Sequence, residues 1–173
     1  MAEHRKRLHW AARLALGAAA GVAGTALMNG YWALVKSMSP PGQEEATTRK
    51  VAAAALQRLG VPHPSRRVRA IGGEVVHWGY GSTWGAVSAV AREAHVPLDA
   101  VGGTLLGAGL WAFGDLWMLH KMGFARHPRR YPLKVHALAL GAHLAYGAGV
   151  WATLAAARRL EHRTEQPPAT LAA

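Results

Sequence analysis

The sequence contains no cysteine in its 173 residues. This absence excludes disulfide bonds, thiolate metal ligands and a cysteine nucleophile. Acidic residues are few: 9 Asp and Glu stand against 20 Lys and Arg, which gives a formal net charge of +11 at pH 7. A nucleic-acid-binding domain presents such a charge on a soluble folded surface, whereas the basic residues here flank long apolar segments. We therefore expect anionic lipid headgroups, and not nucleic acid, as their partner.

Apolar residues make up 51% of the chain, and 20 glycines accompany them. They gather in four long stretches separated by basic residues, a pattern typical of membrane-spanning helices. We predict an all-α membrane protein, an antiparallel bundle of four transmembrane helices with one short interfacial amphipathic helix. Its single membrane domain covers residues 1–160 and precedes a disordered tail at residues 161–173. The spans are expected at residues 10–35, 74–91, 100–123 and 133–157.

The first apolar stretch follows a basic segment, as the apolar part of a secretory signal does. It continues through Tyr31 and Trp32 to Val35, however, which is longer than a signal peptide requires. We expect this stretch to be retained as a helix.

The interfacial helix is predicted at residues 43–60, after two prolines end the first span. Val51, Ala55 and Leu59 repeat there at four-residue spacing, but the segment is too short and too charged to cross a bilayer. A basic link follows it. Six arginines between the spans are expected to lie near lipid phosphates, namely Arg66, Arg67, Arg69, Arg126, Arg129 and Arg130.

Pairs of glycines four residues apart recur within the predicted spans. Such pairs form a flat helix face on which a second helix can approach closely. These faces could pack against one another, or bind a second copy of the chain or a partner membrane protein. The glycines expected to pack in this way are three such pairs, Gly17 and Gly21, Gly81 and Gly85, and Gly103 and Gly107, together with Gly141 and Gly149, between which Ala145 continues the four-residue spacing.

Asp115 lies inside the third apolar stretch, where an unpaired carboxylate is costly. Hairpin topology fixes the direction of each span, and it places the intramembrane polar residues in one half of the bilayer or near its middle. We predict that they form a polar cluster, which comprises Asp115, His77, His136, His143, His120 and Asn29.

Within this cluster, Asp115 and one histidine would form a buried acid–imidazole pair, in which each charge offsets the desolvation of the other. The pair could be a structural lock that fixes helix register, or a proton or ion relay. A metal ion held by histidines and Asp115 is a further alternative, although His136 and His143 are two helical turns apart. Bis-histidine haem is another, but no haem-attachment motif is present. We expect no resident metal or other cofactor.

Catalysis by a hydroxyl nucleophile has little support. Ser82, Thr83 and Ser88 lie in the second span, but the sequence has no G-x-S-x-G turn. Hydroxyl residues in membrane helices usually serve packing. We expect that the protein is not an enzyme.

Five short motifs follow one another along residues 17–160: GVAGTALMN, PP, VHWGYGSTWG, LLGAGLWAFGD and AHLAYG. In their order and spacing the chain resembles the YagU-like family of small bacterial inner-membrane proteins. The resemblance implies a multi-pass protein of the inner membrane, with uncharacterised activity, a link to acid tolerance and no known catalytic residues. Relatives have a second acid next to the first in the third span, whereas Leu116 follows Asp115 here, which argues against a two-carboxylate mechanism. The matching positions are His77, Gly81, Asp115, His136, His143, Tyr146 and Gly147.

The basic residues on the two sides of the membrane favour opposite orientations. More basic residues lie on the side away from the N-terminus, but the basic N-terminus before the first span favours a cytoplasmic N-terminus. We expect an inner-membrane protein whose Asp and His cluster senses or relays protons. The alternative is a non-catalytic structural or assembly subunit that binds a partner through its small-residue helix faces.

Overall fold

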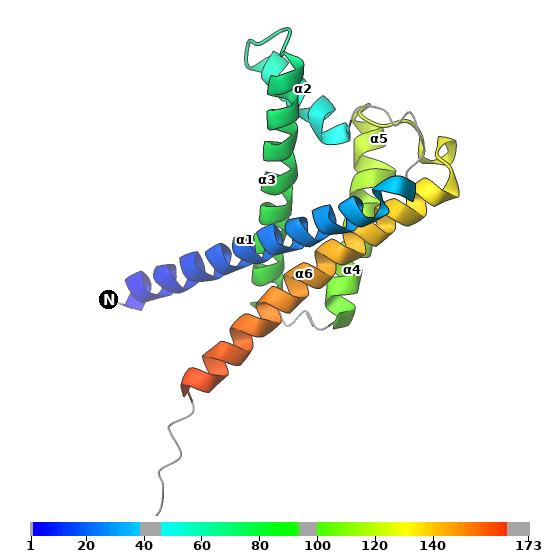
Figure 1. Cartoon of the computed structure of the whole chain (residues 1–173). Helices are drawn as coiled ribbons and strands as arrows, with labels where there is room; N and C mark the ends of the chain where they lie inside the picture. The colour runs from blue at the N-terminus through cyan, green and yellow to red at the C-terminus, as the bar shows by residue number, and fades with distance from the viewer. Residues whose placement is uncertain (1, 39–45, 94–99, 166–173) are drawn as a thin grey trace, which may run out of the picture.

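The computed structural model describes residues 2–38, 46–93 and 100–165, and these residues are all-helical without a strand (Figure 1). The predicted all-α class is therefore confirmed for them. The long helices are α1 (Ala2–Val35), α3 (Arg66–Glu93) and α6 (Leu133–Glu165). The shorter elements are η1 (Lys36–Met38), α2 (Thr47–Arg58), α4 (Ala100–Leu110), the π-helix η2 (Trp111–Met118), α5 (Leu119–Lys121) and η3 (Pro128–Arg130).

Helix α1 is the centre of the arrangement, because it packs against both α3 and α6. Helix α4 packs on α6, and α2 packs on α3. Figure 1 shows α1 and α6 running side by side, with α3 and the α4–α5 segment crossing them steeply. The predicted bundle of four antiparallel neighbours is thus replaced by two crossed pairs, α1 with α3 and α6 with α4.

Two helical segments are long and apolar enough to cross a membrane, Trp10–Met38 and Leu133–Leu160, with mean hydropathies of 1.4 and 1.3. Among the described residues, the second and third predicted spans do not reach the same standard. Helix α3 contains five glycines, four arginines and two glutamates, and the third span contains Asp115 and changes from α-helix to π-helix after Leu110. The structure therefore supports two candidate spans where four were predicted.

Several helix boundaries differ from the prediction. Helix α3 begins at Arg66, so most of the predicted basic link is helical, and the Ser65 hydroxyl caps it by accepting a hydrogen bond from the Val68 amide at 3.3 Å. Helix α2 begins at Thr47 instead of residue 43; residues 43–45 lie outside the described residues.

The outer ends of α1 and α6 also extend beyond the predicted spans. Helix α1 begins at Ala2 and α6 continues to Glu165, so residues 161–165 of the predicted tail are helical. Both extensions are free of Gly and Pro, and charged residues do not by themselves end a helix. Residues 166–173 lie outside the described residues.

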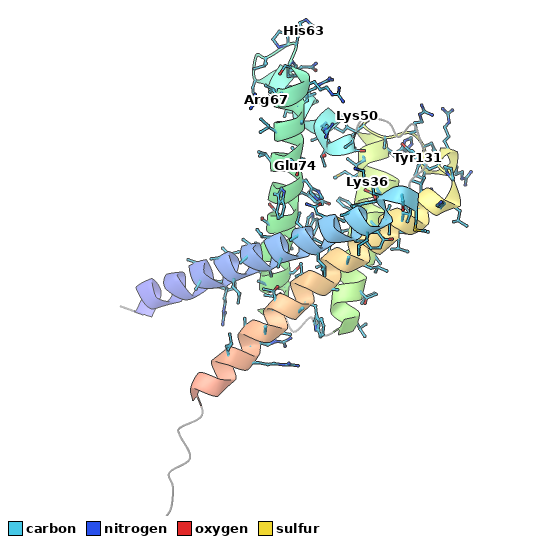
Figure 2. The ribbon with its side chains drawn as sticks, viewed as in Figure 1. Lys36, Lys50, His63, Arg67, Glu74 and Tyr131 are labelled. Carbon is cyan, nitrogen blue, oxygen red and sulfur yellow. The ribbon has the colours of Figure 1, made fainter. Side chains whose placement is uncertain are left out.

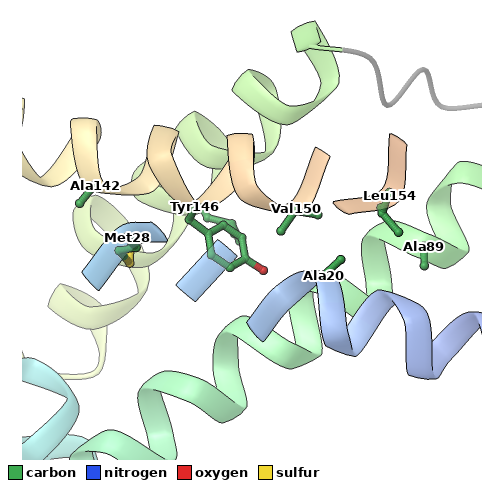
Figure 3. Close-up of a cluster of buried hydrophobic side chains, with 8 residues drawn as sticks. Ala20, Met28, Ala89, Ala142, Tyr146, Val150 and Leu154 are labelled. Atoms are coloured by element: carbon green, nitrogen blue, oxygen red, sulfur yellow. The ribbon is translucent and has the colours of Figure 1, made fainter. Parts of the chain in front are cut away.

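The core is narrow and made mostly of small side chains. Ala20 and Ala142 are fully covered, and Tyr146, Val150 and Leu154 fill the remaining space (Figure 3). Many large apolar side chains point outward instead: Leu34, Leu133, Val75, Leu105 and Val101 are each more than 60% exposed. The molecule is therefore apolar on its outer surface as well as inside.

Glycine sets the close approach of α1 and α3. A Cβ atom on Gly17 would come within 2.7 Å of the Gly85 carbonyl oxygen, and one on Gly21 would collide with the Gly81 carbonyl. The two predicted glycine pairs thus face each other, and the backbones of the two helices touch.

Glycine also sets the contacts of α6. A Cβ on Gly103 would lie 2.9 Å from the Gly147 carbonyl oxygen, and one on Gly107 would collide with the His143 carbonyl. A Cβ on Gly149 would lie 2.7 Å from the Gly24 Cα atom, and one on Gly141 would meet the Tyr31 hydroxyl. All eight glycines predicted to pack face another helix of the same chain.

Candidate functional site

Asp115 and His143 form the central pair of the candidate site. Asp115 lies in the π-helix η2 and His143 in the middle of α6, and their Oδ2 and Nδ1 atoms are 3.9 Å apart. Their side chains are 34% and 16% exposed, respectively. Two elements far apart in sequence therefore bring an acid and an imidazole together at a largely covered position.

The hydrogen bond of His143 fixes which of its nitrogens takes up a proton. Nδ1 lies 2.9 Å from the carbonyl oxygen of Ala139. Since a carbonyl only accepts, Nδ1 carries the hydrogen and Nε2 keeps the lone pair. At 3.9 Å the carboxylate of Asp115 is a neighbouring charge and not a hydrogen-bond partner of Nδ1. A proton gained by His143 would therefore enter at Nε2.

His77 and Asn29 form a second polar pair, between α3 and α1. His77 Nε2 lies 3.0 Å from Asn29 Oδ1 and donates to it. The pair continues the glycine contacts of these helices, because His77 is four residues from Gly81 and Asn29 is eight residues from Gly21. Thr25 lies between Gly21 and Asn29 on α1. It is buried, and its hydroxyl donates to the Gly21 carbonyl at 2.9 Å.

His136 and His120 make other contacts. His136 Nε2 donates to the Pro128 carbonyl at 2.9 Å, and its ring meets Trp111 and Tyr131 edge to face, each at a centroid distance of 6.2 Å. The ring of His120 lies 4.9 Å from that of His127. Direct contacts thus divide the six predicted residues into separate groups.

Longer-range electrostatic interactions connect three of these groups. Among charged groups, Asp115 interacts most strongly with His143 and then with His136, and His77 interacts most strongly with Glu74 and then with His143. Asp115, His143, His136 and His77 therefore belong to one electrostatic neighbourhood, although only the first two form a close pair of ionisable groups.

Two tyrosines and a tryptophan complete the site without having been predicted from spacing. The buried Tyr146 hydroxyl donates to the Gly81 carbonyl at 2.7 Å and ties α6 to α3. Tyr80 interacts electrostatically with Asp115. The Trp111 indole Nε1 is buried and has no hydrogen-bond partner among the described residues. Tyr146 follows His143 by three residues, so the helical face that includes His143 would have identified it.

No three His, Asp or Glu side chains among residues 2–38, 46–93 and 100–165 come together as a metal-binding group. The nitrogens seen to form hydrogen bonds, in His77, His136 and His143, face protein oxygen atoms.

The predicted headgroup arginines gather at the end of the molecule that holds α2, the start of α3 and the start of α6. Figure 2 labels Lys36, Lys50, His63, Arg67 and Tyr131 in this region. Arg69 is partly buried, and the other predicted arginines are exposed: Arg66, Arg67, Arg126, Arg129 and Arg130.

In the part of the chain that the structure describes, fold and site together define an all-helical protein with two helices long and apolar enough to cross a membrane and an ionisable pair between two helices. Comparisons of the chain with protein-family models, with curated proteins and with solved structures found no match.

Proposed function

We propose that the protein is an integral protein of the bacterial inner membrane whose Asp115–His143 pair takes up and releases protons. In this proposal α1 and α6 cross the bilayer, and α3 and the α4–α5 segment pack against them within the same membrane domain. The N-terminus is cytoplasmic, and the resemblance to the YagU-like family suggests a role in acid tolerance.

The distribution of apolar side chains supports the membrane location. Contacts between helices use glycine backbones and hydroxyl, amide and imidazole groups, whereas large apolar side chains point outward. Membrane helices associate in this way, because lipid offers no hydrophobic drive for burying large apolar residues. In water, so much exposed apolar surface would favour aggregation.

The single observation that carries the functional proposal is the proximity of Asp115 and His143 across two helices. An acid and an imidazole 3.9 Å apart stabilise each other's charged forms, so ionised Asp115 serves as the counter-ion of a proton taken up by His143. Nε2 of His143 is the atom that accepts the proton, since Nδ1 is committed to Ala139. The chemistry needs no cofactor and makes no covalent bond, so we propose no enzymatic activity.

Infrared difference spectra of the full-length protein in lipid nanodiscs, recorded between pH 8 and pH 5, test this function. We expect a carboxylic-acid band that is lost in Asp115→Asn, because the amide cannot be protonated in this range. We expect His143→Gln to change the pH at which the band appears. Glu74→Gln, which neutralises an exposed acid of α3, is the matched control and leaves the Asp115 band in place.

Two outcomes would contradict the proposal. A spectrum unchanged by Asp115→Asn would show that the carboxylate does not titrate. An Asp115 band whose pH dependence is the same in His143→Gln would show that the two groups do not act as a pair.

The cysteine-free sequence allows a direct test of orientation. Ser65→Cys and Arg159→Cys place thiols at exposed positions on opposite ends of the helices. With a cytoplasmic N-terminus, an impermeant thiol reagent labels the Ser65 variant in intact cells and the Arg159 variant only after permeabilisation. The reverse pattern would reverse the orientation.

A second candidate function, assembly with another membrane protein, is favoured by Gly79. An added Cβ at Gly79 would meet nothing within 4 Å, and Val75 and Val87 on the same side of α3 are 67% and 46% exposed. The predicted glycine faces are used inside the chain, so this stretch of α3 is the better candidate for a partner. Disulfide trapping of a Gly79→Cys variant in native membranes tests it, and a persistently monomeric variant counts against it.

A further inference from the structure

The segment between α5 and α6 concentrates positive charge. We define the α5–α6 loop as residues 119–134, which include the end of the short helix α5 and the start of α6. Its sequence contains no Asp or Glu. The loop carries Lys121, Arg126, Arg129, Arg130 and Lys134, together with His120 and His127.

Contacts from two helices and one hydrogen bond within the loop hold the α5–α6 loop in place. His136 of α6 donates to the Pro128 carbonyl at 2.9 Å. Lys50 of α2 donates to the Phe124 carbonyl at 3.5 Å, and the Arg126 amide donates to the Tyr131 hydroxyl at 3.0 Å. The basic side chains therefore extend from a fixed backbone, which lowers the entropy cost of binding an anion.

The histidines add a response to acid. His127 Nδ1 lies 3.2 Å from the Arg129 amide nitrogen, and since a backbone amide only donates, this Nδ1 is unprotonated. A proton on Nδ1 breaks that hydrogen bond, frees the Arg129 N–H and adds a positive charge. The ring of His120 lies 4.9 Å from that of His127, so a charge on His120 would add to the positive charge at the same place.

We propose that the α5–α6 loop binds the phosphate of an anionic phospholipid headgroup, and that acid strengthens the binding through His120 and His127. Two exposed apolar side chains in the loop favour a lipid as the source of the phosphate: Met122 is 56% and Leu133 is 83% exposed. Basic groups among exposed apolar groups match the boundary between headgroups and acyl chains.

The charged side chains within the α5–α6 loop are all positive, so in this proposal the bound phosphate stabilises the protonated imidazoles. This inference rests on the membrane location proposed above but not on Asp115, and its failure would leave the Asp115–His143 proposal intact. The charged and titratable groups around the rings are Lys121, Arg126, Arg129, Arg130, Tyr131, Lys50 of α2, and Lys134 and His136 of α6.

The test uses the purified full-length protein in an uncharged detergent, titrated with dioctanoyl phosphatidylglycerol and followed by thermophoresis at pH 8 and pH 5. We expect binding to tighten about tenfold at pH 5, since one charge near an anionic surface is worth about 1 kcal/mol and two imidazoles contribute. Arg129→Gln with Arg130→Gln should weaken binding about tenfold at both pH values.

His120→Gln with His127→Gln should keep the affinity seen at pH 8 and lose the gain at pH 5. If this double variant does not fold, His127→Gln alone, at an exposed position, should lose about half of the gain on the logarithmic scale. Arg66→Gln with Arg67→Gln is the matched control, because it removes two exposed charges from the start of α3 and should leave the acid response intact.

Three results would overturn the inference. Equal binding of dioctanoyl phosphatidylcholine at pH 5 would show that charge does not matter. An acid response that persists without His120 and His127 would assign it elsewhere. Inorganic phosphate that binds as tightly as the lipid would make free phosphate, and not a headgroup, the ligand.

Discussion

The α1–α3 and α4–α6 interfaces begin alike and end differently. Each starts with glycines four residues apart that bring two backbones into contact. In α1–α3 the helices stay regular, and the next polar residues, Asn29 and His77, form a direct hydrogen bond of 3.0 Å. In α4–α6 the α-helix gives way to the π-helix Trp111–Met118, and Asp115 stops 3.9 Å from His143.

We infer from this difference that the polar pair of the α1–α3 interface fixes helix register, whereas the pair of the α4–α6 interface can change its charge. A direct hydrogen bond between a neutral amide and an imidazole in regular helices fixes register. A π-helical turn, which interrupts the α-helical pattern and often marks a functional position, leaves Asp115 close to an imidazole without committing its oxygens to it. The same small-residue packing thus supports both outcomes.

Breaking the α1–α3 interface should have the largest effect. Gly85→Ala adds a Cβ that would lie 2.5 Å from the backbone N and Cα atoms of Gly21, so the helices must separate. We expect a loss of about 1–3 kcal/mol in the free energy of unfolding, or more, as for other overpacked interiors. Unfolding in mixed micelles, followed by tryptophan fluorescence, measures it.

Gly79→Ala is the matched control on the same helix. Its Cβ would meet nothing within 4 Å, and alanine favours the helix by up to about 1 kcal/mol over glycine. The control should therefore be neutral or stabilising. Equal losses for the two variants would refute the view that close backbone approach holds α3 on α1.

Removing the hydrogen bond that joins the two crossed pairs should have an intermediate effect. Tyr146→Phe deletes the hydroxyl that donates to the Gly81 carbonyl at 2.7 Å and leaves the ring in place. We expect a loss of about 1–1.5 kcal/mol in the same unfolding assay, because the Gly81 carbonyl is left without this partner at a buried position. Tyr31→Phe, which removes a partly buried hydroxyl of α1, tests whether the loss of any tyrosine hydroxyl gives the same effect. A Tyr146→Phe variant as stable as the wild type would show that α3 and α6 do not depend on each other through this bond.

Much of the fold could be predicted because local pattern determines it. Apolar runs without proline gave the helices, and small-residue spacing picked out eight of the glycines that meet another helix, although it missed others such as Gly24 and Gly147. The direction of each helix also placed Asp115 and His143 at comparable depth, and this pair is in close contact.

The rest depends on tertiary geometry that spacing does not encode. The direction in which two helices cross depends on which of their glycine faces come into contact. Chain order does not specify this choice, so it does not predict that α3 packs on α1 and α4 on α6. The π-helix alters the face that an α-helical count assigns to Asp115. His136 turns to the Pro128 carbonyl because the loop returns to it, a contact that no periodicity predicts.

The smallest expected effect is the coupling energy within each polar pair. It tests the difference between the α1–α3 and α4–α6 interfaces most directly. We expect a double-mutant cycle of Asn29→Ala and His77→Ala to give about 0.6 kcal/mol, the usual value between membrane helices, at every pH, because His77 Nε2–H donates to Asn29 whether or not the ring is charged. A cycle of Asp115→Asn and His143→Gln should give coupling only where the carboxylate is ionised while the imidazole is protonated. Raising the pH neutralises the imidazole and lowering it neutralises the acid, so this coupling should vanish on both sides of a window. Unfolding free energies measured at a series of pH values give both coupling energies. If neither coupling energy changes with pH, both pairs only hold helices together. A bell-shaped pH dependence for Asp115 and His143 alone would identify that pair as the one that exchanges protons.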